Sequence, residues 1–159
     1  MNDSATLVHA TAVAINGQGV LLTGPSGSGK SDLALRLIDR GAILICDDYC
    51  DIVSDETGPI IRSKPNIAGM IEVRGVGIMN IPHVESAPFA LALNLGDVAE
   101  RLPDDSSVVS LSGWSVPAYP LTPFEKSAPL KAEMLLKRII DEKRVPVRLF
   151  TQGYERSAV

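Results

Sequence analysis

Apolar residues in the first third of the chain form three nearly continuous runs and one stretch with helical spacing. The runs have the length of buried strands and lie at residues 7–15, 19–23 and 42–46. Asn16-Gly17 joins the first two runs and is a strong signal for the two-residue turn of a hairpin. Residues 32–40 carry apolar side chains at helical spacing, and Gly41 is a natural stop for a helix. The pattern therefore predicts two strands, a helix and a third strand.

After residue 46 the apolar runs become shorter and are bounded by turn residues. They predict a short helical turn at residues 65–70 and strands at residues 51–53, 59–62, 89–95 and 108–111. Residues 116–121 contain two prolines, which cannot donate to a sheet ladder, so an edge strand is the most this segment is expected to form. Because hairpins follow a single helix, we predict an α/β fold with a mixed sheet rather than the all-parallel sheet of a simple nucleotide kinase.

The last predicted element is a helix over residues 130–142, whose inner face consists of Leu130, Met134, Leu135 and Ile139. The segment 122–125 has the form of a capping box with proline at the first helical position, but Pro129 follows too soon for one uninterrupted helix. A short turn is therefore expected before the helix. Residues 1–6 and 151–159 are expected to be flexible ends of a single domain that spans residues 1–159.

Composition and charge exclude several classes of protein. Hydrophobic residues make up 45% and charged residues 21%, as in ordinary globular domains, and a net charge of -4 does not resemble the basic surface of a nucleic-acid binder. No apolar run is long enough to span a membrane and no signal-peptide pattern is visible, so a cytoplasmic protein is expected. Cys46 and Cys50 have no further Cys or His at ligand spacing. Free thiols are therefore expected, with a metal or disulfide role as the weaker alternative.

The segment Gly24-Pro25-Ser26-Gly27-Ser28-Gly29-Lys30-Ser31 matches the phosphate-loop pattern G-x-x-x-x-G-K-S/T at every fixed position. The predicted strand before it and the predicted helix after it supply the context that this loop requires. Glycines allow successive backbone N–H groups to turn toward phosphate oxygens, and the helix N-terminus adds partial positive charge. Lys30 is expected to reach the outer phosphates, and the Ser31 hydroxyl to contact Mg²⁺. We therefore predict a nucleotide-phosphate site.

A phosphate loop of this kind needs a second carboxylate near the metal, usually at the end of a neighbouring apolar strand. Asp47 and Asp48 follow the predicted strand 42–46. Adjacent residues of a strand point to opposite faces, so one of the two is expected to face the phosphates unless the strand has already ended. Two roles stay open for Asp47, an indirect metal ligand or the base that orients a substrate hydroxyl, and a solvated turn is the alternative for the pair.

Glu72 and Arg74 lie in a glycine-punctuated segment, residues 71–81. They are two residues apart and share one face if the segment is extended. An acid there can hold the metal, and an arginine can stabilise charge on the transferred phosphoryl group. A structural salt bridge is the commoner role of such a pair. His9 is predicted to lie one strand away from the phosphate loop, and His83 is interpreted as a loop residue.

Four features together resemble the HPr kinase/phosphorylase family. They are His9, the phosphate loop 24–31, the Asp47-Asp48 pair, and the segment Glu72-Val73-Arg74-Gly75-Val76-Gly77-Ile78-Met79-Asn80-Ile81, which is similar to the family's own signature. The resemblance covers residues 8–80 well and the remainder loosely. It implies a P-loop kinase domain related to phosphoenolpyruvate carboxykinase, which uses ATP to phosphorylate a serine of HPr, the phosphocarrier of the sugar phosphotransferase system. It also implies the reverse reaction, in which inorganic phosphate removes the phosphoryl group and pyrophosphate is released.

Carried over by position, the resemblance makes Asp47 the base for serine attack and the acid in the reverse direction. The remaining positions carried over are His9 beside that acid, Lys30 at the phosphates, Ser31 and Glu72 at Mg²⁺, and Arg74 at the transferred phosphoryl group. The family is typically hexameric, so a homo-oligomer is expected.

Two departures from the family pattern bear on this expectation. The kinase region begins almost at Met1, so the chain resembles a short form with the catalytic domain alone. The family's Arg- and Gly-containing loop before the last helix is not recognisable, and Lys126 and Lys131 are the cations in its place. Lysine lacks the planar fork of arginine. Because that loop is tied to phosphorolysis, the kinase direction is the principal expectation.

Two alternative functions stay open. One is a small-molecule P-loop kinase, although no lid with its own arginine cluster is evident after Arg74. The other is a nucleotide- or phosphate-sensing module with little turnover, against which the full set of acid, base and metal residues argues.

Overall fold

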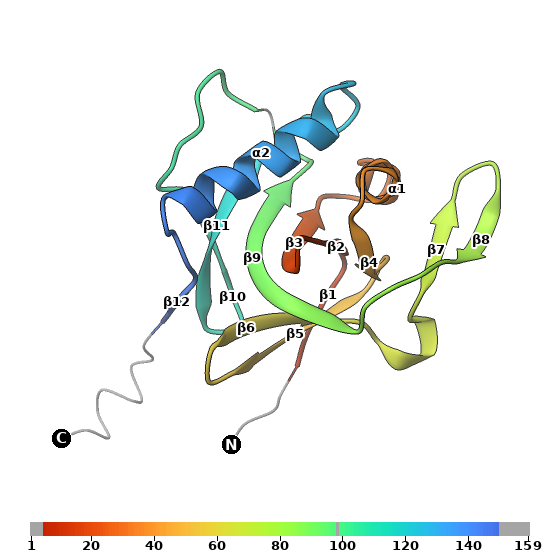
Figure 1. Cartoon of the computed structure of the whole chain (residues 1–159), viewed down its shortest axis with the longest axis horizontal. Helices are drawn as coiled ribbons and strands as arrows, with labels where there is room; N and C mark the ends of the chain where they lie inside the picture. The colour runs from red at the N-terminus through yellow and green to blue at the C-terminus, as the bar shows by residue number, and fades with distance from the viewer. Residues whose placement is uncertain (1–4, 98, 150–159) are drawn as a thin grey trace.

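The fold is a curved mixed sheet with both α-helices packed on one of its faces (Figure 1). The computed structural model describes residues 5–97 and 99–149. The helices are α1 (Lys30–Asp39) and α2 (Ala128–Asp141), and a 3₁₀ turn lies at Pro65–Ile67. The strands are β1 (Thr6–Val8), β2 (Thr11–Ile15), β3 (Gln18–Thr23), β4 (Ile43–Cys46), β5 (Cys50–Asp55), β6 (Gly58–Arg62), β7 (Met70–Val73), β8 (Gly77–Asn80), β9 (Ser86–Asn94), β10 (Val108–Leu111), β11 (Trp114–Pro120) and β12 (Val147–Arg148).

The two ends that were expected to be flexible fall largely outside this description. Residues 1–4 and 151–159 lie outside the described residues, and β1 already begins at Thr6.

The strand β9 has neighbours of both directions and lies at the centre of the sheet. The hydrogen-bonded order is β1-β5-β6-β9-β3-β2-β4, and β11 is attached to β9 and carries β10 and β12. β9 runs antiparallel to β6 and parallel to β3 and β11. The prediction of a mixed α/β sheet is therefore confirmed. β7 and β8 form a separate two-stranded hairpin, which projects at the right of Figure 1.

The hairpin predicted at Asn16-Gly17 connects β2 to β3. Ile15 pairs with Gln18, and the two turn residues have φ angles of 49° and 79°. This is the backbone that favours Asn-Gly in two-residue turns. The preceding run is two strands rather than one, because β1 pairs with β5 whereas β2 pairs with β4. The chain changes partners at His9, which places this residue at the edge of the phosphate site.

Apolar side chains fill both faces of the central sheet, which explains the nearly continuous apolar runs. Val20 and Leu22 of β3 belong to the cluster beneath the helices, whereas Leu21 belongs to the cluster on the opposite face. Trp114 lies in the second cluster with 8% of its surface exposed. The alternation fixes the direction of each side chain along β3, and hence the point at which the phosphate loop leaves the sheet.

The expectation that residues 116–121 form only an edge strand is wrong. β11 pairs with β10 on one side and with β9 on the other. Pro117 is the end of the ladder to β10, and Pro120 is the end of the ladder to β9. Each proline therefore lies where the missing N–H removes no internal ladder bond.

The predicted inner face of the last helix is correct only in part. α2 begins at Ala128, two residues before the predicted start, and takes Pro129 into its first turn. Its buried residues are Ala128, Pro129, Ala132, Leu136 and Ile139. Leu130 and Met134 are 43% and 67% exposed. Alanine at the contact lets the helix lie close to the sheet, and a pattern weighted toward large apolar residues misses that face.

A charged cluster fastens the segment before β10 to α2. Asp105 accepts two hydrogen bonds from Arg138, at 2.9 and 2.6 Å, and one from the Tyr119 hydroxyl at 2.7 Å. Arg138 is the main cause that holds the pKa of Asp105 well below its usual value, and Tyr119 adds to it. These contacts join α2 to β11, the strand that ends at the phosphate site.

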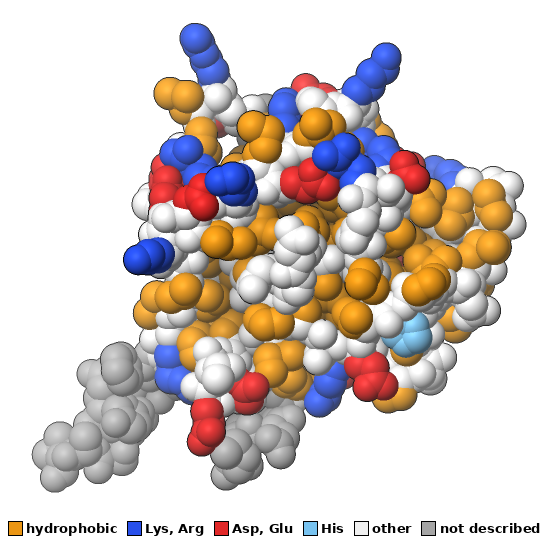
Figure 2. All heavy atoms as spheres, viewed as in Figure 1, with side chains coloured by type: hydrophobic (Ala, Val, Ile, Leu, Met, Phe, Trp, Pro, Cys, Tyr) orange, Lys and Arg blue, Asp and Glu red, His pale blue; other side chains and the backbone are white. Residues whose placement is uncertain are grey.

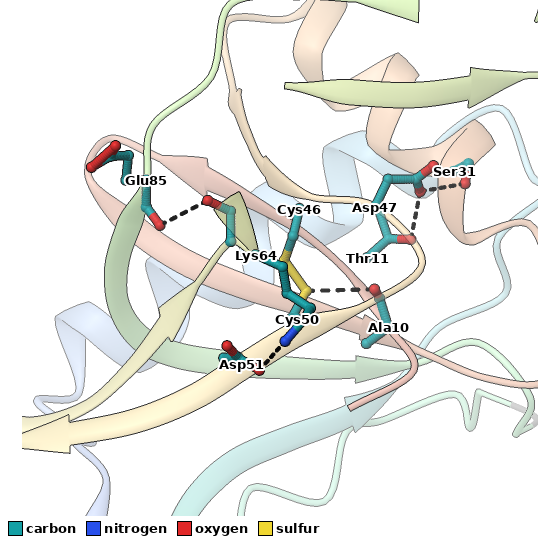
Figure 3. The surroundings of a disulfide bond; sticks show 10 residues. Ala10, Thr11, Ser31, Cys46, Asp47, Cys50, Asp51, Lys64 and Glu85 are labelled. Atoms are coloured by element: carbon teal, nitrogen blue, oxygen red, sulfur yellow. Dashed lines mark hydrogen bonds and ion pairs between the residues drawn. A yellow bond between two sulfur atoms is a disulfide. The ribbon is translucent and has the colours of Figure 1, made fainter. Parts of the chain in front are cut away.

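The two cysteines form a disulfide, so the expectation of free thiols is wrong. Cys46 ends β4 and Cys50 begins β5, with their Cα atoms 5.7 Å apart (Figure 3). Between them the chain reverses: Asp48 has a φ of 68°, and the backbone N–H of Tyr49 donates to the Asp47 carbonyl at 2.8 Å. The spacing of the cysteines gave no sign of this reversal, because it depends on a left-handed residue that is not glycine. The bond closes a ring of chain that contains both aspartates.

The visible surface carries mixed charges. Figure 2 shows acidic and basic side chains interspersed on this face, without a continuous basic patch. Within residues 5–97 and 99–149, no helix is long and apolar enough to cross a membrane.

Candidate active site

The predicted phosphate loop connects β3 to α1. Gly24, Gly27 and Gly29 have φ angles of 147°, 82° and 94°, a backbone that glycine adopts readily and other residues do not. A Cβ on Gly24 would also lie only 2.6 Å from the Ser28 hydroxyl oxygen. α1 begins at Lys30, so its first-turn N–H groups point toward the loop. Together, these backbone donors and the helix N-terminus can bind phosphate oxygens.

Lys30 lies under the loop with only 6% of its surface exposed. Its ammonium group donates to the carbonyl oxygens of Gly24 at 2.8 Å and Pro25 at 3.0 Å. These two bonds hold the start of the loop to the start of α1. The side chain therefore places a positive charge at the loop and stabilises the loop's own backbone.

Both carboxylate oxygens of Asp47 accept hydrogen bonds, and Figure 3 shows the bonds with Ser31 and Thr11. Oδ1 accepts from the Ser31 hydroxyl at 2.6 Å and from the Thr11 hydroxyl at 2.9 Å. Oδ2 accepts from the backbone N–H of Glu72 at 3.1 Å. The side chain is 7% exposed, and these donors compensate the burial of its charge. The carboxylate thus joins α1, β2 and β7 at the hydroxyl expected to contact the metal.

Asp48 opens toward the solvent instead. Its left-handed backbone turns the side chain away from the site of Asp47 and into the cavity at the mouth of the loop. Nε2 of His9 lies 3.9 Å from Oδ1 of Asp48, and the two side chains are 49% and 56% exposed. The ring of Tyr49 lies 5.2 Å from that of His9. His9 therefore pairs with Asp48, whereas the sequence was interpreted as pairing it with Asp47.

The cavity at the mouth of the loop has a volume of about 490 Å³. Besides residues of the loop, its wall contains His9, Asp48, Glu72, Arg74 and Phe124. Glu72 lies in β7 but Arg74 lies in the turn after it, so the two do not share a strand face. They nevertheless meet at the cavity, because the turn between β7 and β8 lies at its rim.

A larger cleft of about 710 Å³ lies between the end of α2 and the strands β6 and β9. Its wall contains none of the predicted site residues. The chemically competent side chains gather at the smaller cavity.

The donor set fits a magnesium ion that is shared with a nucleotide. Among residues 5–97 and 99–149, no group of three or more His, Cys, Asp or Glu side chains could hold a metal by itself. Mg²⁺ in phosphoryl-transfer sites needs only one or two protein oxygens, because phosphates and water complete its coordination. The Ser31 hydroxyl donates its proton to Asp47, which leaves its oxygen lone pairs for a cation, and the Glu72 carboxylate lines the same cavity.

Two residues of the cavity were missed or undervalued by the sequence reasoning. The sequence shows Asp48 as the neighbour of Asp47. Only the left-handed backbone of the turn shows that its side chain faces the cavity. Phe124 was interpreted only as part of a capping box. Its place just after a predicted strand is the signal that could have indicated a role at the site. Its ring is exposed and lies against the backbone of Gly29.

Known proteins are similar to this chain in sequence and in fold. The family model described as HPr Serine kinase C-terminal domain matches residues 3–87. An HPr kinase/phosphorylase of Clostridium botulinum (strain Eklund 17B / Type B) is 49% identical over 77 residues, which are 48% of this chain and 25% of that protein. The HPr kinase/phosphorylase of Geobacillus sp. (strain WCH70) is 44% identical over 77 residues, with the same 48% and 25% coverage. The match thus spans a quarter of the length of these curated relatives.

A solved structure extends the similarity along the chain. The Hpr(Ser) kinase/phosphatase from Coxiella burnetii superposes with a TM-score of 0.74 and 28% sequence identity, covering 87% of this chain and 98% of that one. This match confirms the predicted α/β fold. The family model covers more than half of the chain and includes the predicted site from His9 to Arg74. The chain therefore belongs to the HPr serine kinase C-terminal domain family.

Proposed function

We propose that the chain is an ATP-dependent serine kinase whose substrate is an HPr-type phosphocarrier protein of the phosphotransferase system. One observation carries the proposal: the Ser31 hydroxyl is bonded to Asp47 at the foot of the loop, while Asp48 and His9 open into the cavity at its mouth. Asp47, which contacts the proposed metal ligand Ser31, is thereby separated from Asp48, which a substrate hydroxyl could reach. The relatives named HPr kinase/phosphorylase support the same activity.

The phosphate loop, residues 24–31, is the proposed site for the ATP phosphates. The loop N–H groups bind phosphate oxygens, and Lys30 supplies positive charge beside them. Ser31 and Glu72 are the proposed Mg²⁺ ligands, and Asp47 orients the Ser31 hydroxyl from behind. When bound, magnesium neutralises charge on the phosphates during transfer.

Asp48, rather than Asp47, is the proposed base for the serine hydroxyl of the substrate. Asp47 is buried and already accepts three hydrogen bonds, so it has little capacity for an incoming hydroxyl. Asp48 faces the cavity and is half exposed, so a substrate hydroxyl can reach it. His9 lies beside Asp48 and would orient this carboxylate and share the proton it accepts.

Arg74 is the proposed partner of the transferred phosphoryl group, where a guanidinium can stabilise developing negative charge. The reverse reaction, with inorganic phosphate as the acceptor and pyrophosphate as a product, would use the same acid in the opposite direction. Lys131, in the first turn of α2, is however paired at 2.8 Å with Glu125 of the turn before that helix. No arginine occurs there, so the kinase direction is proposed as the principal activity.

A protein substrate suits the surroundings of the cavity better than a small molecule does. Val76, Ile78 and Met79 of the β7–β8 hairpin are 66%, 63% and 44% exposed beside the cavity rim. Figure 2 shows apolar side chains along this edge of the molecule. Exposed apolar area next to a catalytic cavity is typical of a surface that contacts another protein. A cytoplasmic location and a homo-oligomer, hexameric as in the family resemblance, complete the proposal.

The proposal is tested by incubating the protein with Mg²⁺, labelled ATP and an HPr-type carrier, with Lys30→Ala as the control. Label on a serine of the carrier that disappears in the variant is the expected result. Nucleotide binding without any labelled product would favour the sensing module instead. Label that appears on a small metabolite but not on the carrier would favour a small-molecule kinase.

A further inference from the structure

Three parallel strands end side by side at the phosphate site. β3 and β11 both run parallel to β9 and flank its C-terminal part. The backbone N–H of Leu95 donates to the Thr23 carbonyl at 2.8 Å, and that of Leu121 donates to the Asn94 carbonyl at 3.0 Å. These bonds continue the alignment just beyond the strand ends. In open α/β sheets, ligands bind in the crevice outside the carboxyl ends of such strands.

The strand order places different elements on the two sides of the cavity at the mouth of the phosphate loop. The phosphate loop follows β3, and the sheet continues on one side to β2 and β4 and on the other to β9 and β11. His9 and Asp48 adjoin β2 and β4, so the acceptor chemistry lies on that side. Phe124 follows β11 and lines the same cavity from the opposite side.

Phe124 is an exposed aromatic ring that lies directly against the phosphate loop. Its surface is 68% exposed, and a Cβ on Gly29 would lie 2.9 Å from two of its ring atoms. Asp32, in the first turn of α1, lines the same part of the cavity. One ring edge is therefore in contact with the loop, and much of the remaining ring surface is open to a ligand.

The position of the ring is fixed relative to α1. The guanidinium of Arg36 donates to the Pro123 carbonyl and, at 3.2 Å, to the Glu125 carbonyl. Its Nε donates to Asp32 at 3.0 Å, which holds the guanidinium in place. The two carbonyls flank Phe124, so the segment that carries the ring is bound to the helix that begins with Lys30. An exposed aromatic side chain held in this way is already positioned to stack on a planar group of a ligand.

We propose that Phe124 stacks on the base of the nucleotide whose phosphates occupy the loop. The inference rests on the proposed use of ATP and adds the element that recognises its base. With the outermost phosphate directed to the side of Asp48, the remainder of the nucleotide extends toward β9 and β11, where the ring lies. Stacking on a single ring tolerates any base, so Phe124 contributes affinity for nucleotides over bare polyphosphates rather than a choice of base.

The test compares the dissociation constants of ATP and inorganic tripolyphosphate, each with Mg²⁺, by calorimetry. In the Phe124→Ala variant we expect ATP affinity to fall ~5- to 150-fold, the range for loss of a base-stacking ring, with tripolyphosphate affinity unchanged. Phe124→Tyr, which keeps the ring, should bind ATP within ~2-fold of the natural protein. Leu102→Ala is the matched control, because Leu102 is 76% exposed and does not line the cavity.

Equal losses for ATP and tripolyphosphate in Phe124→Ala would overturn the inference, since the ring would then act on the loop and not on a base. Unchanged ATP affinity would overturn it as well. The kinase proposal fails separately, through the absence of label on the carrier. If the carrier stays unlabelled while the Phe124→Ala substitution weakens the binding of ATP but not of tripolyphosphate, base stacking stands without the kinase. If the natural protein bound neither ATP nor tripolyphosphate, both the base-stacking inference and the kinase proposal would be wrong.

Discussion

The floor of the active site and the β7–β8 hairpin at its rim are built in opposite ways. At the floor, Asp47 is buried, accepts three hydrogen bonds and lies within a ring closed by the disulfide. At the rim, β7 and β8 form a sheet of two strands, and all four residues of β8 are exposed. A lone pair of strands gains little stability on its own. The floor beside the phosphate loop is therefore held by several hydrogen bonds and a covalent link, whereas the hairpin at the rim keeps apolar surface uncovered.

The largest effects are expected when Asp47 and Asp48 are substituted separately. Asp48→Asn should lower phosphoryl transfer ~100-fold or more, the scale for loss of an acid–base group, while leaving Mg²⁺–ATP affinity unchanged. Asp47→Asn should weaken Mg²⁺–ATP binding and lower the free energy of unfolding, because the amide nitrogen replaces one acceptor oxygen and cannot accept the bonds made there, either those from Ser31 and Thr11 or that from the Glu72 backbone. Transfer rates under single turnover and calorimetric binding separate the two effects.

The opposite pattern would reverse the assignment of roles. If Asp47→Asn kept full ATP affinity and lost only the transfer step, Asp47 would be the base. Asp48 would then be a surface residue that happens to contact His9.

A second change removes the covalent closure of the floor. The double variant Cys46→Ser, Cys50→Ser should lose about 2 kcal/mol of unfolding free energy, the chain-entropy value for so short a loop. Urea unfolding measures this loss. A dithiol reductant should lower the stability of the natural protein by a similar amount and leave the double variant unchanged. Equal stability of both proteins without reductant would mean that the hydrogen bonds alone hold Asp47.

The smallest effect on stability is expected at the rim. Ile78→Ser removes an exposed apolar side chain, so unfolding free energy should change by no more than ~0.5 kcal/mol. Transfer to the carrier should nevertheless show a KM raised several-fold at constant kcat, because only the encounter with the protein substrate is weakened. Val108→Ser is the control, since Val108 is 53% exposed in β10 and does not line the cavity. Equal KM values for the two variants would remove the hairpin from the docking surface.

Local signals in the sequence were sufficient for the elements that position the phosphates. The glycine loop, the strand before it, the helix after it and the Asn16-Gly17 turn each depend on residues within a few positions of one another. The mixed sheet followed from the scarcity of helices. Because these features depend on neighbouring residues, a single sequence is sufficient to predict them.

The remaining features depend on contacts between distant residues. The different surroundings of Asp47 and Asp48, on which their proposed exchange of roles rests, depend on the left-handed backbone at Asp48 and on donors contributed by β2, α1 and β7. The position of Phe124 depends on Arg36, which lies 87 residues or more from the carbonyls it binds. The pattern of apolar residues alone contains neither fact. The disulfide is a different case, because it joins residues only four positions apart but requires a left-handed backbone at Asp48, a residue that does not predict one.

β9 gives the molecule a mechanical constraint through its change of neighbours. Its first residues pair with β6, and its last residues lie between β3 and β11. Ala87, Phe89 and Ala92 pack in the cluster on the face opposite the helices, and Leu91 and Leu93 pack in the cluster beneath the helices. The part of the sheet that contains β6 and the part that contains β3 and β11 are therefore joined through one continuous strand. Packing around Ala87 and Phe89, which do not line the cavity at the phosphate loop, therefore helps to set where the strand edge at Asn94 lies beside Thr23 and the start of that loop.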